Sequence, residues 1–306
     1  MAVIPLEFKV RGRFLKVRQA SLPVREQLYM SDCAIADEEN KVRIIEFLLR
    51  NLRVAGYRWD IFAAADTLEN SCIATALHGL SSHRVVSKST DDCSLVAVSP
   101  YSELLKRVSP NFRKNINKRR RKLEGIPDVA FSIESDLNQV EATFDEFLTL
   151  ESSGWKAGKS RARGDVTKPF AIALNEKKKN FYKRVVKEFA ERGQMRIVCI
   201  RVGPRLIAAR IWLLLNQICY SLKTAYDEDY SSYSPGTLAF DHGYRQLAEA
   251  GEVTEINTIT SGHAAENWKP EKVRYLSLLC FNNSVAGKLF YLAYRIRAAL
   301  KKSSSM

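Results

Sequence analysis

The sequence predicts an α/β protein of two lobes, each a mixed, largely antiparallel sheet flanked by helices. Short apolar segments typical of strands alternate along the chain with segments whose apolar residues recur at helical spacing. The length of 306 residues favours two domains, because one domain typically has roughly 100–200 residues. A basic segment that ends at Gly125 suggests the boundary. We therefore expect lobes over residues 1–125 and 126–282, and a basic amphipathic helix over residues 283–306.

The first lobe shows a β-α-β rhythm after an uninformative start. A helix is predicted over residues 40–54, and its expected apolar stripe is Ile44, Phe47, Leu48 and Leu52. A buried strand is predicted over residues 59–66, a helix through residues 72–80 and a strand over residues 93–99.

The most charged element follows, as a helix predicted over residues 110–124. Phe112, Ile116 and Leu123 share one of its faces, and basic side chains cover the rest. These side chains form either a solvated surface or a ledge for a phosphate-bearing ligand, and their charge alone does not choose between the two.

The second lobe should begin with a strand over residues 129–134 and a helix over residues 138–151, with four side chains inward: Val140, Phe144, Phe147 and Leu148. A further helix should bury Phe181, Val185 and Phe189 and end at Gly193. Three antiparallel strands come next, over residues 195–202, 205–215 and 218–227. Gly203-Pro204 is the turn between the first two.

Composition limits the function classes. Net charge is +14, which favours anionic partners without naming them. The six cysteines are scattered and none has metal-ligand spacing, so no zinc or disulfide role is expected. No apolar run reaches the ~18 residues that span a bilayer, and the N-terminus has no signal-peptide pattern. We expect a cytoplasmic protein.

A candidate anion site follows the strand predicted over residues 218–227. Ser234 is a fitting N-cap, Pro235 suits a first helical turn, and Gly236 allows close approach of a ligand before Thr237. Free N–H groups at such a helix start bind anions. By itself the pattern is weak evidence, because Ser-Pro-Gly also begins helices that bind nothing.

The ordered set of segments is more specific. FRKNINKRRRKLE, FLTLESSGW, FYKRVVKEFAERGQMRIVCIRVGPRLIAARI, YSLKTAYDEDYSSYSPGTLAF and the final EINTITSG with a following Trp occur in the chain in this order. In this arrangement the sequence resembles the CelD-like branch of the GNAT acetyltransferases, which is related to the Fem-type peptidyltransferases. The resemblance covers residues 57–280.

The resemblance implies two GNAT-like lobes, an activated acyl donor and an amine acceptor. It assigns the pyrophosphate of the donor to the backbone amides of Ser234, Pro235, Gly236 and Thr237. As part of the basic ledge, Arg113 is a further candidate contact for the donor. The loop lacks the Gly-rich form usual for acetyl-CoA. Acyl-CoA, a phosphopantetheine arm on an acyl carrier protein and aminoacyl-tRNA therefore all stay open as donors, and no metal is expected.

Direct transfer to an amine needs a neutral nucleophile, a stabilised oxyanion and a proton for the leaving group. Candidate bases are Asp227 and Glu255, and candidate proton donors are Tyr226 and Tyr233. Asp227 has an alternative role as the cap of the following turn, and Tyr226 as an ordinary strand residue.

The acceptor side should carry four further candidates from polar loops and a strand. Trp155 and Trp268 are expected to line a pocket, together with Asn257, and His263 lies in the last loop. A Tyr-Lys pair that many relatives carry before this tryptophan is replaced here by Ala264-Ala265-Glu266-Asn267. The acceptor is therefore unusual or the activity is weak.

Three functions follow from the residues and the resemblance. The preferred one is an N-acyltransferase that uses a thioester donor. The second is a Fem-like transferase that takes its acyl group from aminoacyl-tRNA, helped by the basic helix. The third is a non-catalytic nucleic-acid or membrane-surface binding module. The C-terminal helix either contacts an anionic membrane as a peripheral anchor or packs on the first lobe.

Overall fold

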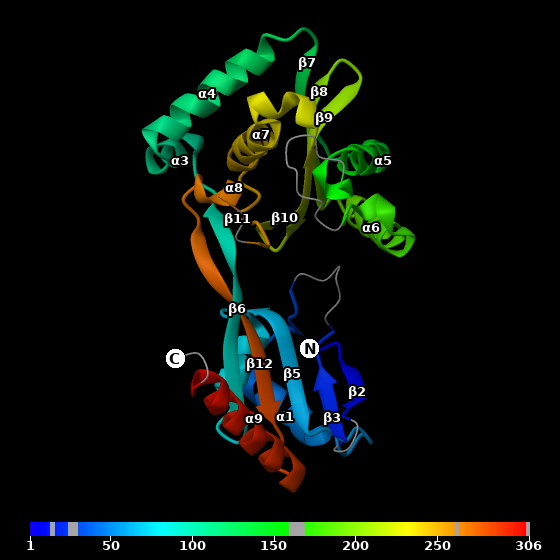
Figure 1. Cartoon of the computed structure of the whole chain (residues 1–306), viewed down its shortest axis with the longest axis vertical. Helices are drawn as coiled ribbons and strands as arrows, with labels where there is room; N and C mark the ends of the chain where they lie inside the picture. Colours follow the sequence, from blue (N-terminus) through cyan, green and yellow to red (C-terminus); the bar gives the residue numbers. More distant parts are fainter. Residues whose placement is uncertain (13–15, 24–29, 159–168, 261–262, 304–306) are drawn as a thin grey trace. The chain divides into compact units, whose positions relative to one another are not determined.

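The computed structural model describes residues 1–12, 16–23, 30–158, 169–260 and 263–303 (Figure 1). The chain divides into two compact units, Met1–Cys93 with Val273–Met306, and Ser94–Lys272. This division differs from the expected boundaries after residues 125 and 282. The basic helix packs within the second unit, and a late strand returns the chain to the first.

Unit 1 is built on strands β2, β3, β5, β12 and β6, in that order. β2 pairs antiparallel with β3, β3 parallel with β5, and β5 antiparallel with β12. A separate antiparallel pair joins β1 to β4. The strand bounds are Ala2–Val3 (β1), Glu7–Arg11 (β2), Val17–Ser21 (β3), Ala34–Ile35 (β4), Ile61–Leu68 (β5), Arg84–Ala97 (β6) and Glu271–Phe281 (β12).

Helices α1 (Lys41–Asn51) and α2 (Cys72–His78) supply the core of unit 1 together with β5 and β12. The expected stripe of α1 is confirmed in part. Leu52 is buried, and Ile44 and Leu48 pack half-buried against the core, whereas Phe47 is 69% exposed. The most deeply buried residues, Ile45 and Leu49, lie next to the expected ones. Both neighbouring faces of α1 carry aliphatic residues, so contact with α2 and not periodicity decides which face turns inward.

The last helix, α9 (Val285–Ser303), packs its aromatic face within unit 1. Tyr291 and Tyr294 lie 5.4 and 6.0 Å from the ring of Phe281. An aliphatic stripe of the same helix stays exposed: Val285, Leu289, Leu292, Ile296 and Leu300. Among the helices that the structure describes, none combines the length and the apolarity needed to cross a membrane.

The strands of unit 2 lie in the order β6, β11, β10, β9, β8 and β7. The pairs from β7 to β10 are antiparallel, and β10 pairs with β11 in parallel. The strand bounds are Val129–Glu134 (β7), Met195–Val202 (β8), Arg205–Leu215 (β9), Ile218–Tyr226 (β10) and Glu255–Asn257 (β11).

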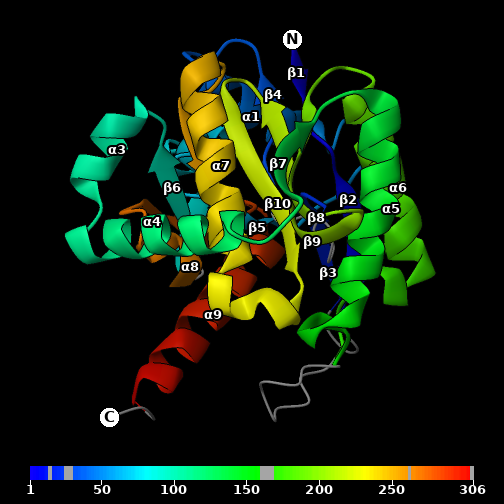
Figure 2. The ribbon, with the colours of Figure 1, turned by 90° about the horizontal axis from the view of Figure 1, so that it is seen from above.

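Helices cover both faces of this sheet (Figures 1 and 2). The helix bounds are Tyr101–Arg107 (α3), Pro110–Glu124 (α4), Leu137–Ser153 (α5), Glu176–Ala190 (α6), Pro235–Ala250 (α7) and His263–Glu266 (α8), and short 3₁₀ segments are Trp155–Ala157 (η1), Ile172–Leu174 (η2) and Glu228–Tyr233 (η3). Val198 and Ile200 of β8 join the core under α3, α4 and α7, whereas Ile197 and Cys199 join the core under α5 and α6. Two apolar layers on one sheet follow from the two-residue repeat of a strand.

The predicted inward face of α5 is confirmed, since Val140, Phe144, Phe147 and Leu148 are all buried. The predicted face of α6 was wrong. Tyr182, Val186 and Ala190 are buried instead of Phe181, Val185 and Phe189. The two sets lie one residue apart, and packing on α5 selects between them.

Helix α4 has the bounds that the sequence predicts and is held by a buried carboxylate of α7. Asp241 is fully buried and lies 3.0 Å from Arg120 of α4 and 3.0 Å from Arg245. The hydroxyl of Tyr101 donates to the same carboxylate at 2.6 Å. This cluster joins α3, α4 and α7 in one charge-assisted network.

Candidate functional site

Strands β10 and β11 diverge beside the start of α7. They pair only from Ile218 opposite Glu255 to Tyr220 opposite Asn257, where β11 ends, while β10 continues to Tyr226. The register of β10 against β9 shifts between Ser221 and Lys223, which marks a bulge at the point of divergence. Beyond Tyr220, the edge of β10 that faces away from β9 has no strand partner among the described residues.

Helix α7 starts at the far end of this edge with an unusual cap. Ser234 is in the left-handed region with φ +53° and makes no side-chain cap. Its role as an N-cap is therefore performed by its carbonyl, which accepts the N–H groups of Thr237 and Leu238 at 3.0 and 3.1 Å. Pro235 has no N–H, and the Gly236 N–H has no hydrogen-bond partner in the described part of the chain. A non-glycine residue in this region carries strain that often marks a functional position.

Arg210 of β9 lies beside the first turn of α7. Its Nε donates to the carbonyl of Gly236 at 3.0 Å, and its Nη1 lies 3.3 Å from the hydroxyl of Ser221. The guanidinium also lies 5.1 Å from the ring centroid of Phe240. Burial lowers the pKa of Arg210 to about 10, so it stays charged at neutral pH. No carboxylate of the described residues pairs with it, which leaves a positive charge beside a free N–H.

Two tyrosines flank the same turn. The ring of Tyr226 would lie 3.5 Å from a Cβ placed at Gly236, so Tyr226 adjoins the helix start. Lys122 of α4 lies 5.1 Å from the ring centroid of Tyr233. The basic helix therefore reaches the site through Lys122. Arg113 stands nine residues earlier, about 13 Å along the helix, and donates to the carbonyl of Leu105 at 3.1 Å.

Asp227 has the capping role that was its alternative. Its carboxylate accepts the N–H of Asp229 at 3.1 Å and forms an ion pair with Arg205. Both interactions hold η3, the segment between β10 and α7. Asp227 therefore acts as the cap of η3, and its role as a base stays a prediction.

Trp155 also lies near the C-terminal end of β10, beside η3. Its backbone N–H donates to the carboxylate of Glu228 in η3 at 2.9 Å, and its ring lies 5.3 Å from that of Phe170. Next to it, buried Lys156 bonds to Glu151 at 2.9 Å and to the carbonyl of Thr224 at 2.6 Å. The polar loop after α5 is thus tied to β10, and the predicted substrate contact of Trp155 stays a prediction.

Glu255 lies away from this group. It begins β11 opposite Ile218, which is eight residues and about 26 Å of strand from Tyr226. Burial and the nearby charge of Glu271 raise the pKa of Glu255. The structure does not bring Glu255 together with Tyr226, Asp227 and Tyr233. Asn257 lies at the root of the divergence, where it is buried and accepts the N–H of Ile259 at 2.7 Å.

The expectation that Trp268 lines a pocket is corrected. It is 3% exposed and lies 5.0 Å from the ring of Phe112 and 4.8 Å from that of Phe240, within the core. The large ring fills space in the apolar core beneath its polar loop. His263 begins α8, but its side chain lies outside the described residues.

Sequence reasoning missed Arg210 and Lys122 as members of the site. An arginine in the middle of the apolar run LIAARIWLLL was the available signal for Arg210. Lys122 had none, because it is one of several basic residues on α4.

Comparisons with known proteins agree with this geometry. The sequence profile described as an acetyltransferase (GNAT) domain matches residues 110–270, more than half of the chain. Among curated proteins, none matches. Among solved structures, FemX is similar with a TM-score of 0.55 and 9% identity, covering 94% of this chain and 90% of its own.

Two further structures are similar. One is the C-terminal domain of a putative lysylphosphatidylglycerol synthetase from Agrobacterium fabrum, with a TM-score of 0.53, 14% identity, and coverage of 94% of this chain and 84% of that one. The other is a conserved protein of unknown function from Bacteroides thetaiotaomicron, with a TM-score of 0.52, 11% identity, and coverage of 87% of this chain and 79% of that one. At these identities the likeness concerns the fold.

Proposed function

The chain belongs to the acetyltransferase (GNAT) domain family, and from this premise we propose that it transfers an acyl group from a thioester donor to an amine. The donor is acyl-CoA or an acyl group on the phosphopantetheine arm of a carrier protein. The observation that carries the proposal is the divergence of β10 from β11 beside a helix start that holds a free N–H and the uncompensated charge of Arg210.

The donor's phosphate belongs at the start of α7. The Gly236 N–H, the positive end of the helix and the guanidinium of Arg210 together supply donors and charge for an anion. Lys122 adds a further cation beside Tyr233. The extended arm that follows the phosphate then lies along the unpaired edge of β10, where backbone groups are available to it.

The transfer itself is direct. The amine lone pair attacks the thioester carbonyl carbon, and a C–N bond forms while the carbonyl oxygen takes up negative charge. Backbone N–H groups at the bulge of β10 stabilise that oxyanion. The C–S bond then breaks, the thiolate takes a proton from the hydroxyl of Tyr226, and the new amide loses its extra proton to solvent, from which Tyr226 recovers its own.

Thermal stability against a panel of donors tests the proposal. A donor that binds only the folded protein adds about 2.7 kcal/mol at 100 times its Kd, so acyl-CoA or acyl carrier protein should raise Tm. Gly236→Trp should abolish that rise by filling the helix start. Gln246→Trp, on the exposed face of the same helix, is the matched control and should leave the rise intact.

Aminoacyl-tRNA is the second candidate donor, favoured by the basic surface of α4 and by the position of Lys122 near the site. A rise in Tm with aminoacyl-tRNA, weakened by salt and absent with thioesters, would replace the first proposal with this one. A panel in which no donor changes Tm would contradict both.

We also propose that α9 contacts an anionic membrane surface. Its exposed aliphatic stripe, described above, runs along a helix that carries Lys288, Arg295 and Arg297. A basic amphipathic helix with one unpartnered apolar face is typical of interfacial anchors.

A further inference from the structure

Unit 1 contains a cavity of about 440 Å³, separate from the start of α7. Its walls come from β3, the end of α1, the segment before β5, the loop between α2 and β6, and the turn between β12 and α9. Among the described residues that line it, none is acidic and four are arginines: Arg18, Arg50, Arg53 and Arg58. Such a wall is unusual, because like charges repel one another without a counter-charge.

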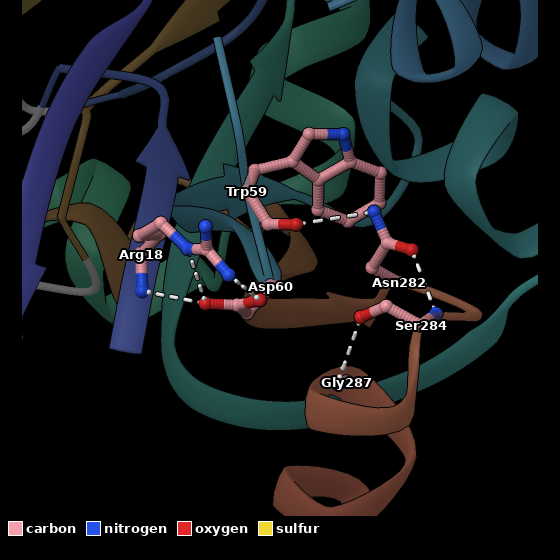
Figure 3. A network of polar contacts seen from close by, with 6 residues as sticks. All are labelled: Arg18, Trp59, Asp60, Asn282, Ser284 and Gly287. Carbon is pink, nitrogen blue, oxygen red and sulfur yellow. Dashed lines mark hydrogen bonds and ion pairs between the residues drawn. The ribbon is translucent and has the colours of Figure 1, made fainter. Parts of the chain in front are cut away.

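Among the residues that the structure describes, two of the four arginines have a carboxylate partner. Arg18 binds buried Asp60 through both carboxylate oxygens, at 3.1 and 3.2 Å (Figure 3). Arg50 lies 2.8 Å from Glu46 on the same helix. Within the described part of the chain, no carboxylate pairs with Arg53 or Arg58. The cavity therefore carries two guanidinium groups in excess.

The rest of the wall is uncharged and held together by hydrogen bonds. The indole N–H of Trp59 donates to the carbonyl of Leu49 at 3.0 Å, and its ring lies 5.8 Å from that of His83. Asn282 donates to the Trp59 carbonyl at 3.1 Å, and its side-chain oxygen accepts the N–H of Ser284 at 2.9 Å (Figure 3). These bonds fix the cavity wall to the beginning of α9.

The start of α9 adds to the positive potential at this wall. The Ser284 hydroxyl accepts the Gly287 N–H at 3.1 Å and so caps the helix. The positive end of a 19-residue helix then lies beside the arginines. Burial lowers the pKa of His83, so its ring is neutral at neutral pH and serves as a polar, uncharged part of the wall.

We propose that this cavity binds a phosphomonoester. Guanidinium groups bind phosphate through paired N–H donors, and Arg53 and Arg58 supply the two charges that match its dianion. The volume leaves room for an ester group against Trp59 and His83. A soluble metabolite and the headgroup of a lipid share this chemistry, and both are tested below.

Calorimetric titration with glycerol 3-phosphate at low ionic strength tests the site. Arg53→Gln/Arg58→Gln should weaken binding by roughly tenfold or more, since each charged hydrogen bond contributes well above thermal energy. Arg11→Gln/Arg43→Gln removes the same net charge from exposed positions of unit 1 outside the cavity. This control should bind within about twofold of the parent protein, as expected for remote screened charges.

Binding to lipid vesicles distinguishes a lipid headgroup from a soluble phosphomonoester. If vesicles containing phosphatidic acid bind in an Arg53- and Arg58-dependent way and phosphatidylcholine vesicles do not, the phosphomonoester is a lipid headgroup. If only glycerol 3-phosphate depends on these arginines, it is a soluble ester. Absence of binding to both glycerol 3-phosphate and phosphatidic acid vesicles, or equal weakening by both double variants, would overturn the proposal. All four arginines substituted are exposed, so unchanged Tm values should confirm that the variants fold.

Discussion

Lys156 and Arg210 are both basic residues in apolar surroundings, yet their partners differ. Lys156 is 8% exposed and pairs with Glu151, whose other oxygen accepts the Ile172 N–H at 2.7 Å. Arg210 has backbone and hydroxyl partners but no described counter-ion. A buried charge with a complete set of partners is structural, whereas one that lacks a counter-ion beside a helix start is suited to an anionic ligand.

Lys156→Met should therefore destabilise the protein by about 3–5 kcal/mol, because it leaves the carboxylate of Glu151 buried and unpaired. The matched control is Lys183→Met, which removes an ion pair with Asp145 that is largely exposed and should cost about 0–1 kcal/mol. Urea unfolding measures both. Equal effects would show that the Lys156–Glu151 pair is not buried as described.

Glu255 should make stability depend on pH. Its pKa is raised in the folded state by burial and by Glu271, so the folded protein holds this proton more tightly than the unfolded chain. Below the pKa of Glu255 in the unfolded chain, the group is protonated in both states and does not destabilise the fold. The free energy of unfolding then declines as pH rises through the pKa of Glu255 in the folded protein.

Glu255→Gln should accordingly raise Tm at pH 7, and the gain should vanish well below pH 4.5, the ordinary value for the group. Glu271→Gln, which removes the neighbouring charge, should give a smaller gain in the same direction. A gain for Glu255→Gln that is the same at all pH values would contradict the assignment.

At the scale of elements, α7 lies close to the sheet because of one residue. A Cβ at Gly243 would come closer than 3.0 Å to the ring of Trp212 and to Val198. A Cβ at Gly236 meets only Tyr226, at the ordinary distance of 3.5 Å. The approach of α7 to β8 and β9 therefore depends on a glycine in its middle.

Gly243→Ala should destabilise the protein by about 1–3 kcal/mol through overpacking, even though alanine favours a helix by about 1 kcal/mol. Gly236→Ala serves as the control and should stay within about 1 kcal/mol of the parent protein. Chemical unfolding distinguishes them, and a stabilised Gly243→Ala would show that the contact with Trp212 relaxes freely.

The elements were largely predictable from spacing, and their faces less so. The predicted bounds of α4 and β7 are confirmed, as are the hairpin strands β8 and β9. The buried face of α6 was wrong by one residue, and that of α1 was wrong at Phe47, because each helix carries apolar side chains on adjacent positions. Only the contacting helix decides between such positions, and periodicity does not report it.

At the scale of the whole molecule, the charge of +14 and the exposed stripe of α9 favour association with an anionic surface. Attraction between basic residues and anionic lipid is additive over many charges and is screened by salt. Burial of the aliphatic stripe adds a contribution that salt does not weaken.

Ile296→Glu should reduce cosedimentation with phosphatidylglycerol vesicles roughly tenfold, since burying one such side chain contributes about 1.5–3 kcal/mol. Ala293→Glu makes the same change of charge at another exposed position of α9 and should have a smaller effect. Equal losses would mean that charge alone, and not the aliphatic stripe, drives association. Retained binding in both variants would remove α9 from the proposal.

The sequence by itself determined the α/β class, the order of most elements and the presence of a helix start at Ser234-Pro235-Gly236. These features follow from local periodicity, turn residues and capping preferences, which act over a few residues. The capping role of Asp227 was also one of the two roles that the sequence left open.

Only the tertiary structure decided which residues meet. It placed Arg210 and Lys122 beside α7, moved Glu255 to the other end of β10, buried Trp268 and gathered four arginines in unit 1. It also assigned the basic helix to unit 2. These outcomes depend on strand register and on packing between segments far apart in the chain, and neither is encoded in the spacing of neighbouring residues.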